Sequence, residues 1–149
     1  MKTFSLYRRA SDKARRPKAQ ALVEFAAVLP LLLFMALMML ETGRLAYTQI
    51  VVTNAAWEGA RVGATLAHPE QGDAEIMGAV RRAAYGLDAS RLKIQIQPTQ
   101  HEYPRNLPAP YPRGYPLKVK VTYELPLFLW PITVPITAQA TTVMEYQNP

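Results

Sequence analysis

An apolar run near the N-terminus constrains this chain more than any other feature. Residues 21–40 contain a single charged side chain, Glu24. A helix rises about 1.5 Å per residue, so twenty residues would cover roughly 30 Å, the thickness of a bilayer's hydrocarbon core. The basic segment KARRPK precedes the run, and Glu41 and Arg44 follow it. The sequence therefore predicts one membrane-spanning helix over about residues 21–40.

The distribution of charge predicts which side of the membrane each part occupies. The net charge of +6 lies entirely in residues 1–19, which carry seven basic side chains and one acidic one. Residues 20–149 carry ten of each and are neutral. Short basic segments beside a span stay in the cytoplasm, so we expect residues 1–19 to be a basic cytoplasmic leader. A nucleic-acid-binding surface would need excess positive charge on the folded part, so no nucleic-acid partner is expected.

Beyond the span, the hydrophobic periodicity predicts an α+β fold. Apolar and small residues at spacings of three and four continue the helix, which we expect over residues 20–67. His68-Pro69 ends it. Asp73 is expected to cap a short second helix. Alternation of period two then predicts three strands, at residues 92–97, 117–122 and 136–145.

Each predicted strand has one apolar face, which is typical of an antiparallel sheet with one buried side. We therefore expect residues 68–149 to form an extracytoplasmic α+β domain packed on the long helix. The connection over residues 98–116 contains six prolines and three tyrosines. A connection of this length without regular structure indicates either function or disorder.

A row of small residues follows one face of the predicted helix at spacings of four: Ala55, Gly59, Gly63 and Ala67. Such rows let two backbones approach closely. Glycine within a helix costs roughly 1 kcal/mol relative to alanine, so its presence indicates a packing role. Two interpretations remain. The row packs under the domain's own sheet, which we favour, or it contacts another subunit.

The segment between the second and third predicted strands is more apolar than a surface loop should be. It reads LPLFLWPI over residues 125–132. A candidate partner patch consists of Leu127, Phe128, Leu129 and Trp130. An exposed patch of this kind indicates contact with a partner or a membrane. The alternative is that the segment folds under the domain.

No motif for catalysis, metal binding or cofactor binding is visible in the sequence. His68 and His101 are the two histidines, neither lies in a metalloprotease helix motif, and there is no cysteine. The serines lie outside any nucleophile-elbow context, and no glycine-rich phosphate loop is present. We therefore expect no enzyme activity and no cofactor.

The residues Ala19-Gln20-Ala21-Leu22-Val23-Glu24-Phe25 resemble a prepilin-type processing site. Together with Glu41-Thr42-Gly43-Arg44 and TNAAWEGAR at residues 53–61, they make the chain similar to the TadE-like minor pilins (pseudopilins) of tight-adherence, or Flp-type, pili. The resemblance covers about forty-five residues and is loose beyond Leu66.

This resemblance implies a pilin-like fold and a structural role in pilus assembly. It implies that a prepilin peptidase cuts between Ala19 and Gln20, which makes Glu24 the fifth residue of the mature chain. The family usually has glycine before the cut, where this chain has Ala19. The implied partners are that peptidase and other pilins or pseudopilins. The implied location is the inner (cytoplasmic) membrane with the N-terminus inside, or the surface pilus itself.

The chemistry of Glu24 supports a role in assembly without the family. A carboxylate at the edge of the hydrocarbon costs a few kcal/mol unless it is paired. Lys18 is a candidate partner in the uncut chain, and the free amine of a neighbour's Gln20 is one after cleavage. The plainer interpretation is a carboxylate that reaches the headgroups. The alternative function is accordingly an uncleaved, single-pass, membrane-anchored binding domain, and the position of Glu24 favours the pilin-like subunit.

Overall fold

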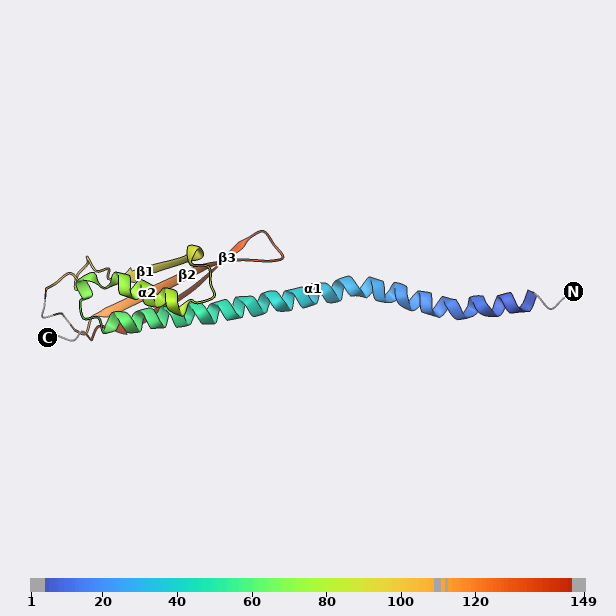
Figure 1. Cartoon of the computed structure of the whole chain (residues 1–149), viewed down its shortest axis with the longest axis horizontal. Coiled ribbons are helices and arrows are strands. Elements are labelled where there is room, and N and C mark those ends of the chain that lie inside the picture. The colour runs from blue at the N-terminus through green and yellow to red at the C-terminus, as the bar shows by residue number, and fades with distance from the viewer. Residues whose placement is uncertain (1–4, 109–110, 112, 146–149) are drawn as a thin grey trace. The chain divides into compact units, whose positions relative to one another are not determined.

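The computed structural model describes residues 5–108, 111 and 113–145, and for residues 5–19 it describes the backbone alone. The contacts divide the chain into two compact units, with the boundary between Thr42 and Gly43. The elements in chain order are α1 (Ser5–Ala64), η1 (Pro69–Gln71), α2 (Asp73–Ala83), η2 (Ala89–Arg91), β1 (Leu92–Gln97), β2 (Pro116–Pro126) and β3 (Thr133–Val143) (Figure 1). The predicted α+β class, with one long helix, a short second helix and a three-stranded antiparallel sheet, is confirmed.

The first unit consists of the part of α1 that ends at Thr42. Every side chain over residues 21–40 is exposed, including all the leucines, phenylalanines and methionines of the run. Among the residues that the structure describes, α1 is the one helix long and apolar enough to cross a membrane. An apolar surface exposed on all sides is what a helix facing lipid presents.

The second unit is built around an antiparallel sheet with the order β1-β2-β3. Alternate residues of the central strand β2 are buried and form one face: Leu117, Val119, Val121, Tyr123 and Leu125. The strand extends to Pro126, four residues beyond its predicted end, because Tyr123 and Leu125 continue that apolar face. Its last residue pairs with Thr133, so β3 begins before the predicted start at residue 136.

The C-terminal part of α1 and the helix α2 supply the rest of the core. Val52, Ala56 and Ala60 on α1 are fully buried, and so are Ile76 and Val80 on α2. Figure 1 shows α2 lying beside this part of α1 and the sheet. The core cluster combines these residues with the buried face of β2 and with Ile136, Ala140 and Met144. The domain is therefore held by apolar packing between two helices and one sheet face.

Helix α1 ends at Ala64, three residues before its predicted end at Ala67. The backbone N–H of Glu145 donates to the Ala64 carbonyl at 2.8 Å, and the Thr65 N–H donates to the Val62 carbonyl at 3.2 Å. The first of these bonds brings the chain that follows β3 against the helix end. Ala67 is exposed and lies outside the helix, so it does not extend the row of small residues.

Asp73 is not the cap of α2, contrary to the sequence prediction. Gly72 holds the capping position without a side-chain bond, and Asp73 is the first helical residue. Its carboxylate accepts hydrogen bonds from the Gln100 backbone N–H, at 3.1 Å, and from the guanidinium of Arg105. The reason is tertiary: a cation from the distant proline-rich connection occupies the carboxylate, which is then unavailable to the helix N-terminus.

Arg105 fixes the described part of that connection to the domain. Its side chain is completely buried. Besides binding Asp73, it donates to the Pro98 carbonyl at 2.9 Å and to the Pro69 carbonyl at 3.0 Å. A buried guanidinium is tolerated because acceptors pair with its charge and with both of its terminal nitrogens, whereas its Nε–H has no partner among the described residues. The connection between β1 and β2 is thus anchored to the core through one side chain.

Candidate assembly site

The predicted processing segment lies within α1. The amide of Gln20 donates to a carboxylate oxygen of Glu24 at 3.0 Å, and both side chains are exposed. Glu24 therefore lies one helical turn after the predicted first residue of the mature chain. The Gln20–Glu24 contact was not foreseen, although a spacing of four places two helical side chains on one face. Ala19 and Lys18 lie where only the backbone is described, and the processing roles of Ala19 and Gln20 stay predictions.

A shallow apolar concavity on the exposed surface of the first unit is a second candidate feature. Its volume is about 420 Å³, and its lining consists of Phe34, Met35, Met38, Met39 and Thr42. The Thr42 hydroxyl donates to the Met38 carbonyl at 2.9 Å, so its polar atom is satisfied within the helix. Methionine side chains adapt to an irregular partner surface.

The row of small residues is enclosed by the second unit. A Cβ atom built on Gly59 would lie 2.5 Å from Cγ2 of Val80, and one built on Gly63 would overlap Leu117. Ala55 is fully buried. Of the two interpretations drawn from the sequence, this geometry supports packing within the subunit. The close approach of α1 to α2 and β2 leaves no room for a side chain at either glycine.

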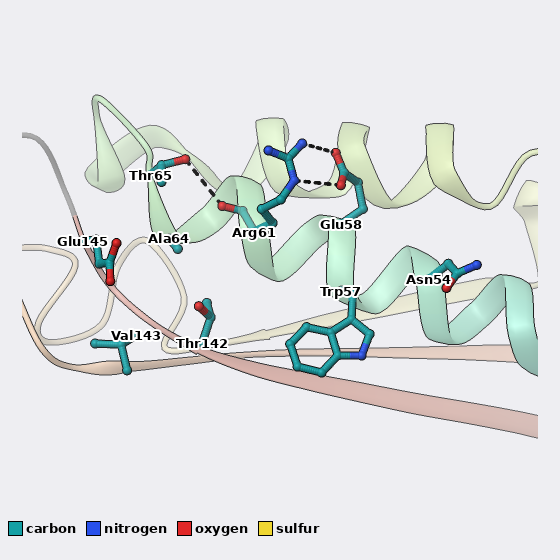
Figure 2. A pocket seen from close by; sticks show the side chains of 9 residues that line it. All are labelled: Asn54, Trp57, Glu58, Arg61, Ala64, Thr65, Thr142, Val143 and Glu145. Carbon is teal, nitrogen blue, oxygen red and sulfur yellow. Dashed lines mark hydrogen bonds and ion pairs between the residues drawn. The ribbon is translucent and has the colours of Figure 1, made fainter.

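A groove between α1 and the end of β3 is a third candidate feature, and it lies in the second unit. Its volume is about 710 Å³, and it is lined by Asn54, Trp57, Glu58, Arg61, Ala64, Thr65, Thr142, Val143 and Glu145. Figure 2 shows Trp57 projecting from one side of the helix and the Glu58–Arg61 pair from the other. The Trp57 side chain is 57% exposed. A partly exposed tryptophan beside an edge strand is a candidate contact for another protein.

The ion pair in this groove is well formed but exposed. Two guanidinium nitrogens of Arg61 donate to the two carboxylate oxygens of Glu58, at 2.6 and 3.0 Å. This hydrogen bonding lowers the pKa of Glu58 and raises the pKa of Arg61. Exposed pairs contribute little to stability, so the pair's main effect is to orient two charges on the surface. Sequence reasoning missed this groove because its two walls are far apart in the chain.

The candidate partner patch forms the turn between β2 and β3. Phe128 is 83% exposed and Trp130 is 59% exposed, whereas Leu127 and Leu129 are partly buried. The two aromatic side chains therefore do not fold under the domain. The backbone of the turn is closed by a hydrogen bond from the Leu127 N–H to the Ile132 carbonyl at 3.0 Å.

Both histidines of the sequence, His68 and His101, are exposed. Nδ1 of His68 lies 3.5 Å from a carboxylate oxygen of Glu70, which also accepts the Tyr111 hydroxyl at 3.2 Å. Hydrogen bonds from its own backbone N–H and from that tyrosine lower the pKa of Glu70. His101 is exposed in the connection that follows β1. Among the described residues, no group of three or more potential ligands is placed to hold a metal ion.

Comparison with known families identifies the N-terminal part of the chain. The model of the family described as TadE-like protein matches residues 19–61. No curated protein and no solved structure matches the chain. The matched residues contain the predicted cut, Glu24, the apolar run and Trp57, and the TadE-like family is one of structural pilus components. The predicted resemblance is therefore confirmed over residues 19–61, where the chain is similar to the TadE-like family, and the apolar helix in this segment supports anchoring in a membrane.

Proposed function

We propose that this protein is a TadE-like pseudopilin, a non-enzymatic structural and assembly component of a tight-adherence (Flp-type) pilus. The observation that carries the proposal is where the family match begins. It starts at residue 19, the last residue of the basic leader, and it covers Glu24 and the exposed apolar helix. A cut between Ala19 and Gln20 by a prepilin peptidase would expose this helix at the start of the mature chain.

The cut would create a new charge that Glu24 can bind. A free amine at Gln20 would be cationic at neutral pH. The exposed Glu24 carboxylate accepts a hydrogen bond from the neutral amide of Gln20, and an ammonium is a stronger partner for it. Near hydrocarbon the attraction between opposite charges is much larger than at a wet surface. The amine of one subunit and Glu24 of its neighbour would therefore set the register between two helices.

The exposed surface of the apolar helix supplies the rest of the proposed contact. Apolar side chains gain nothing by leaving lipid for another apolar surface, so helices associate in membranes through close packing and polar contacts. The concavity lined by Phe34 and the methionines offers such packing. The basic leader would hold the N-terminus in the cytoplasm and place the second unit outside the inner membrane.

The processing step is tested by the mass of the intact protein purified from its own host. The proposal expects a chain that begins at Gln20. Ala19→Gly, which restores the residue usual in the family, should increase the processed fraction, and Ala19→Leu should decrease it. A wild-type chain that retains residues 1–19 would contradict the proposal and favour the uncleaved, membrane-anchored binding domain.

The assembly step is tested with Glu24→Ala. Removing a charge makes the span more apolar, so the amount of protein in the membrane should not fall. Crosslinking to other pilins and the number of filaments should both fall, because a neighbour's amine loses its partner. Glu24→Gln removes the charge but keeps the size of the side chain. The matched control is Glu75→Ala, which removes an exposed carboxylate from α2. Normal crosslinking and piliation in Glu24→Ala would show that this carboxylate merely faces the headgroups.

A further inference from the structure

The turn between β2 and β3 exposes more large apolar side chains than a surface in water should. Phe128, Trp130 and Ile132 are each more than half exposed. No charged residue occurs between Leu125 and Met144. Clustered apolar side chains of this kind indicate a surface that is covered in the working protein. The question is which surroundings cover it.

The direction of β2 along α1 places this turn at one end of the second unit. Near its start, Leu117 contacts the site of Gly63, and Val119 lies 3.2 Å from a Cβ built on Gly59. Near its end, the guanidinium of Arg44 donates to the Pro126 carbonyl at 3.4 Å. The strand therefore runs antiparallel to residues 44–63 of the helix. The turn continues past Pro126, so it lies at the end of the unit that contains Arg44. Figure 1 shows the connection between β2 and β3 at the opposite end of the unit from the C-terminal end of α1.

Chain connectivity relates this end to the membrane. Arg44 follows Leu40, the last residue of the apolar run, by four residues. Even a fully extended chain covers at most about 14 Å in four residues. Arg44, and with it the base of the turn, is consequently held near the surface of any bilayer that the apolar run crosses.

We propose that the β2–β3 turn, residues 127–132, is a lipid-contacting anchor that inserts Phe128, Trp130 and Ile132 into the boundary between headgroups and acyl chains. Tryptophan is enriched at this boundary because it has an apolar body and a polar N–H group. The absence of charge from residue 125 to residue 144 removes the main obstacle to insertion.

The backbone of the turn is suited to these surroundings. Leu127 N–H donates to the Ile132 carbonyl at 3.0 Å, and Ile132 N–H donates to the Trp130 carbonyl at 2.7 Å. Polar backbone groups that are bonded within the turn lose less on leaving water. Lipid explains the site better than a second copy of the chain, because only four residues separate the span from Arg44, whose side chain is bonded to the base of the turn, in every copy. The inference rests on membrane anchoring and does not depend on the pilin function or on which side the unit occupies.

The test uses the fluorescence of the full-length protein in vesicles of phosphatidylethanolamine and phosphatidylglycerol, at a low ratio of protein to lipid. The chain has two tryptophans, Trp57 and Trp130, so Trp57→Phe leaves Trp130 as the reporter. Lipids with bromine on the upper part of the acyl chains quench tryptophans that contact them. We expect brominated lipid to reduce Trp130 emission at least twofold and the emission maximum to be shifted to shorter wavelength.

The matched control is Trp130→Phe, which leaves Trp57. This residue lies thirteen positions after Arg44, about 20 Å along the helix, and its emission should be unchanged by brominated lipid. Phe128→Ser in the Trp57→Phe background should weaken the quenching of Trp130. Two results would overturn the proposal. Trp130 unquenched by bromine but protected from aqueous iodide would show that protein covers the turn. If iodide quenches Trp130 but brominated lipid does not, the turn is exposed to water and neither lipid nor protein covers it.

Discussion

Two stretches of the same helix, residues 21–40 and residues 45–64, are both rich in apolar residues, yet the structure uses them in opposite ways. The first presents large side chains, such as Leu31 and Phe34, exposed all round. The second buries a narrow strip that contains Val52, Ala56 and Ala60. Size distinguishes the two surfaces. A helix that faces lipid needs only to be apolar, whereas a helix that packs on a sheet must also match its shape.

The two stretches should accordingly be sensitive to different kinds of substitution. Water does not drive the association of helices within lipid, so the span is sensitive to polarity and tolerant of size. Burial of the second stretch stabilises the domain by about 25 cal/mol per Å² of apolar surface, provided that the atoms fit. Polar substitutions should therefore damage residues 21–40, and larger side chains should damage the buried strip in residues 45–64.

The largest effect is expected where the second unit buries a charge. Asp73→Asn leaves the fully buried guanidinium of Arg105 without its anionic partner. Removing one member of such a pair costs about 3–5 kcal/mol, and the partial exposure of Asp73 places the expected loss near the lower figure. The measurement is the free energy of unfolding of the domain in the detergent-solubilised protein. The fraction of the protein in membranes should not change.

The control for Asp73→Asn is Asp88→Asn, which alters an exposed carboxylate that accepts hydrogen bonds from Ser90. It should change stability much less. Equal losses from the two substitutions would mean that the Asp73–Arg105 pair does not stabilise the domain.

A polar substitution should separate the two stretches directly. Leu32→Arg places a charge near the middle of the span, which costs about 2.5–3.5 kcal/mol in membrane insertion. Ile50→Arg adds the same charge at an exposed position of α1 in the second unit and should be tolerated. The readout is the fraction of protein that resists extraction by alkaline carbonate. Equal retention of both variants would mean that residues 21–40 do not span the bilayer.

A small increase in size should give the converse result. Gly63→Ala forces a methyl group against Leu117 and Ile76, both fully buried, and overpacking of this kind costs about 1–3 kcal/mol. A Cβ on Gly43 would meet nothing within 4 Å. Gly43→Ala should therefore stabilise the helix by up to about 1 kcal/mol. Resistance to trypsin measures both variants. If Gly63→Ala is as resistant as the parent, the small-residue row is not packed within the subunit.

The smallest expected effect is the pH dependence of the stability that the hydrogen bond between Tyr111 and Glu70 contributes. The pKa of Glu70 is lowered by a hydrogen bond from its own backbone N–H and, to a smaller extent, by the one from Tyr111. Its contribution to stability is therefore present above its unfolded pKa of about 4.5 and is lost as the pH falls through the lowered folded pKa. Tyr111→Phe should slightly reduce stability at neutral pH. The difference from the parent should shrink in acid, as thermal unfolding followed by circular dichroism would show. A difference that is constant with pH would mean that the hydroxyl acts independently of the Glu70 charge.

Sequence reasoning succeeded where the signal is local. The apolar run, the period of two in the strands and the start of a second helix near Asp73 are each visible within a few residues. The end of α1 and the extra length of β2 were missed because they depend on distant partners, Glu145 and Thr133. No local pattern marks Arg105 as the buried partner of Asp73. In the candidate site, Glu24 was found through spacing and resemblance, but the groove around Trp57 joins segments about eighty residues apart.

The bond between Glu145 and Ala64 has a consequence for how the protein is made. Residue 64 leaves the ribosome long before residue 145 does. The end of α1 therefore lacks the hydrogen bond from Glu145 while the rest of the domain is synthesised. Contacts between residues so far apart in the chain form late and slow the folding of a domain. Until then the apolar faces of α1 and the sheet remain uncovered. A chaperone or protease that recognises exposed apolar surface has that interval in which to act.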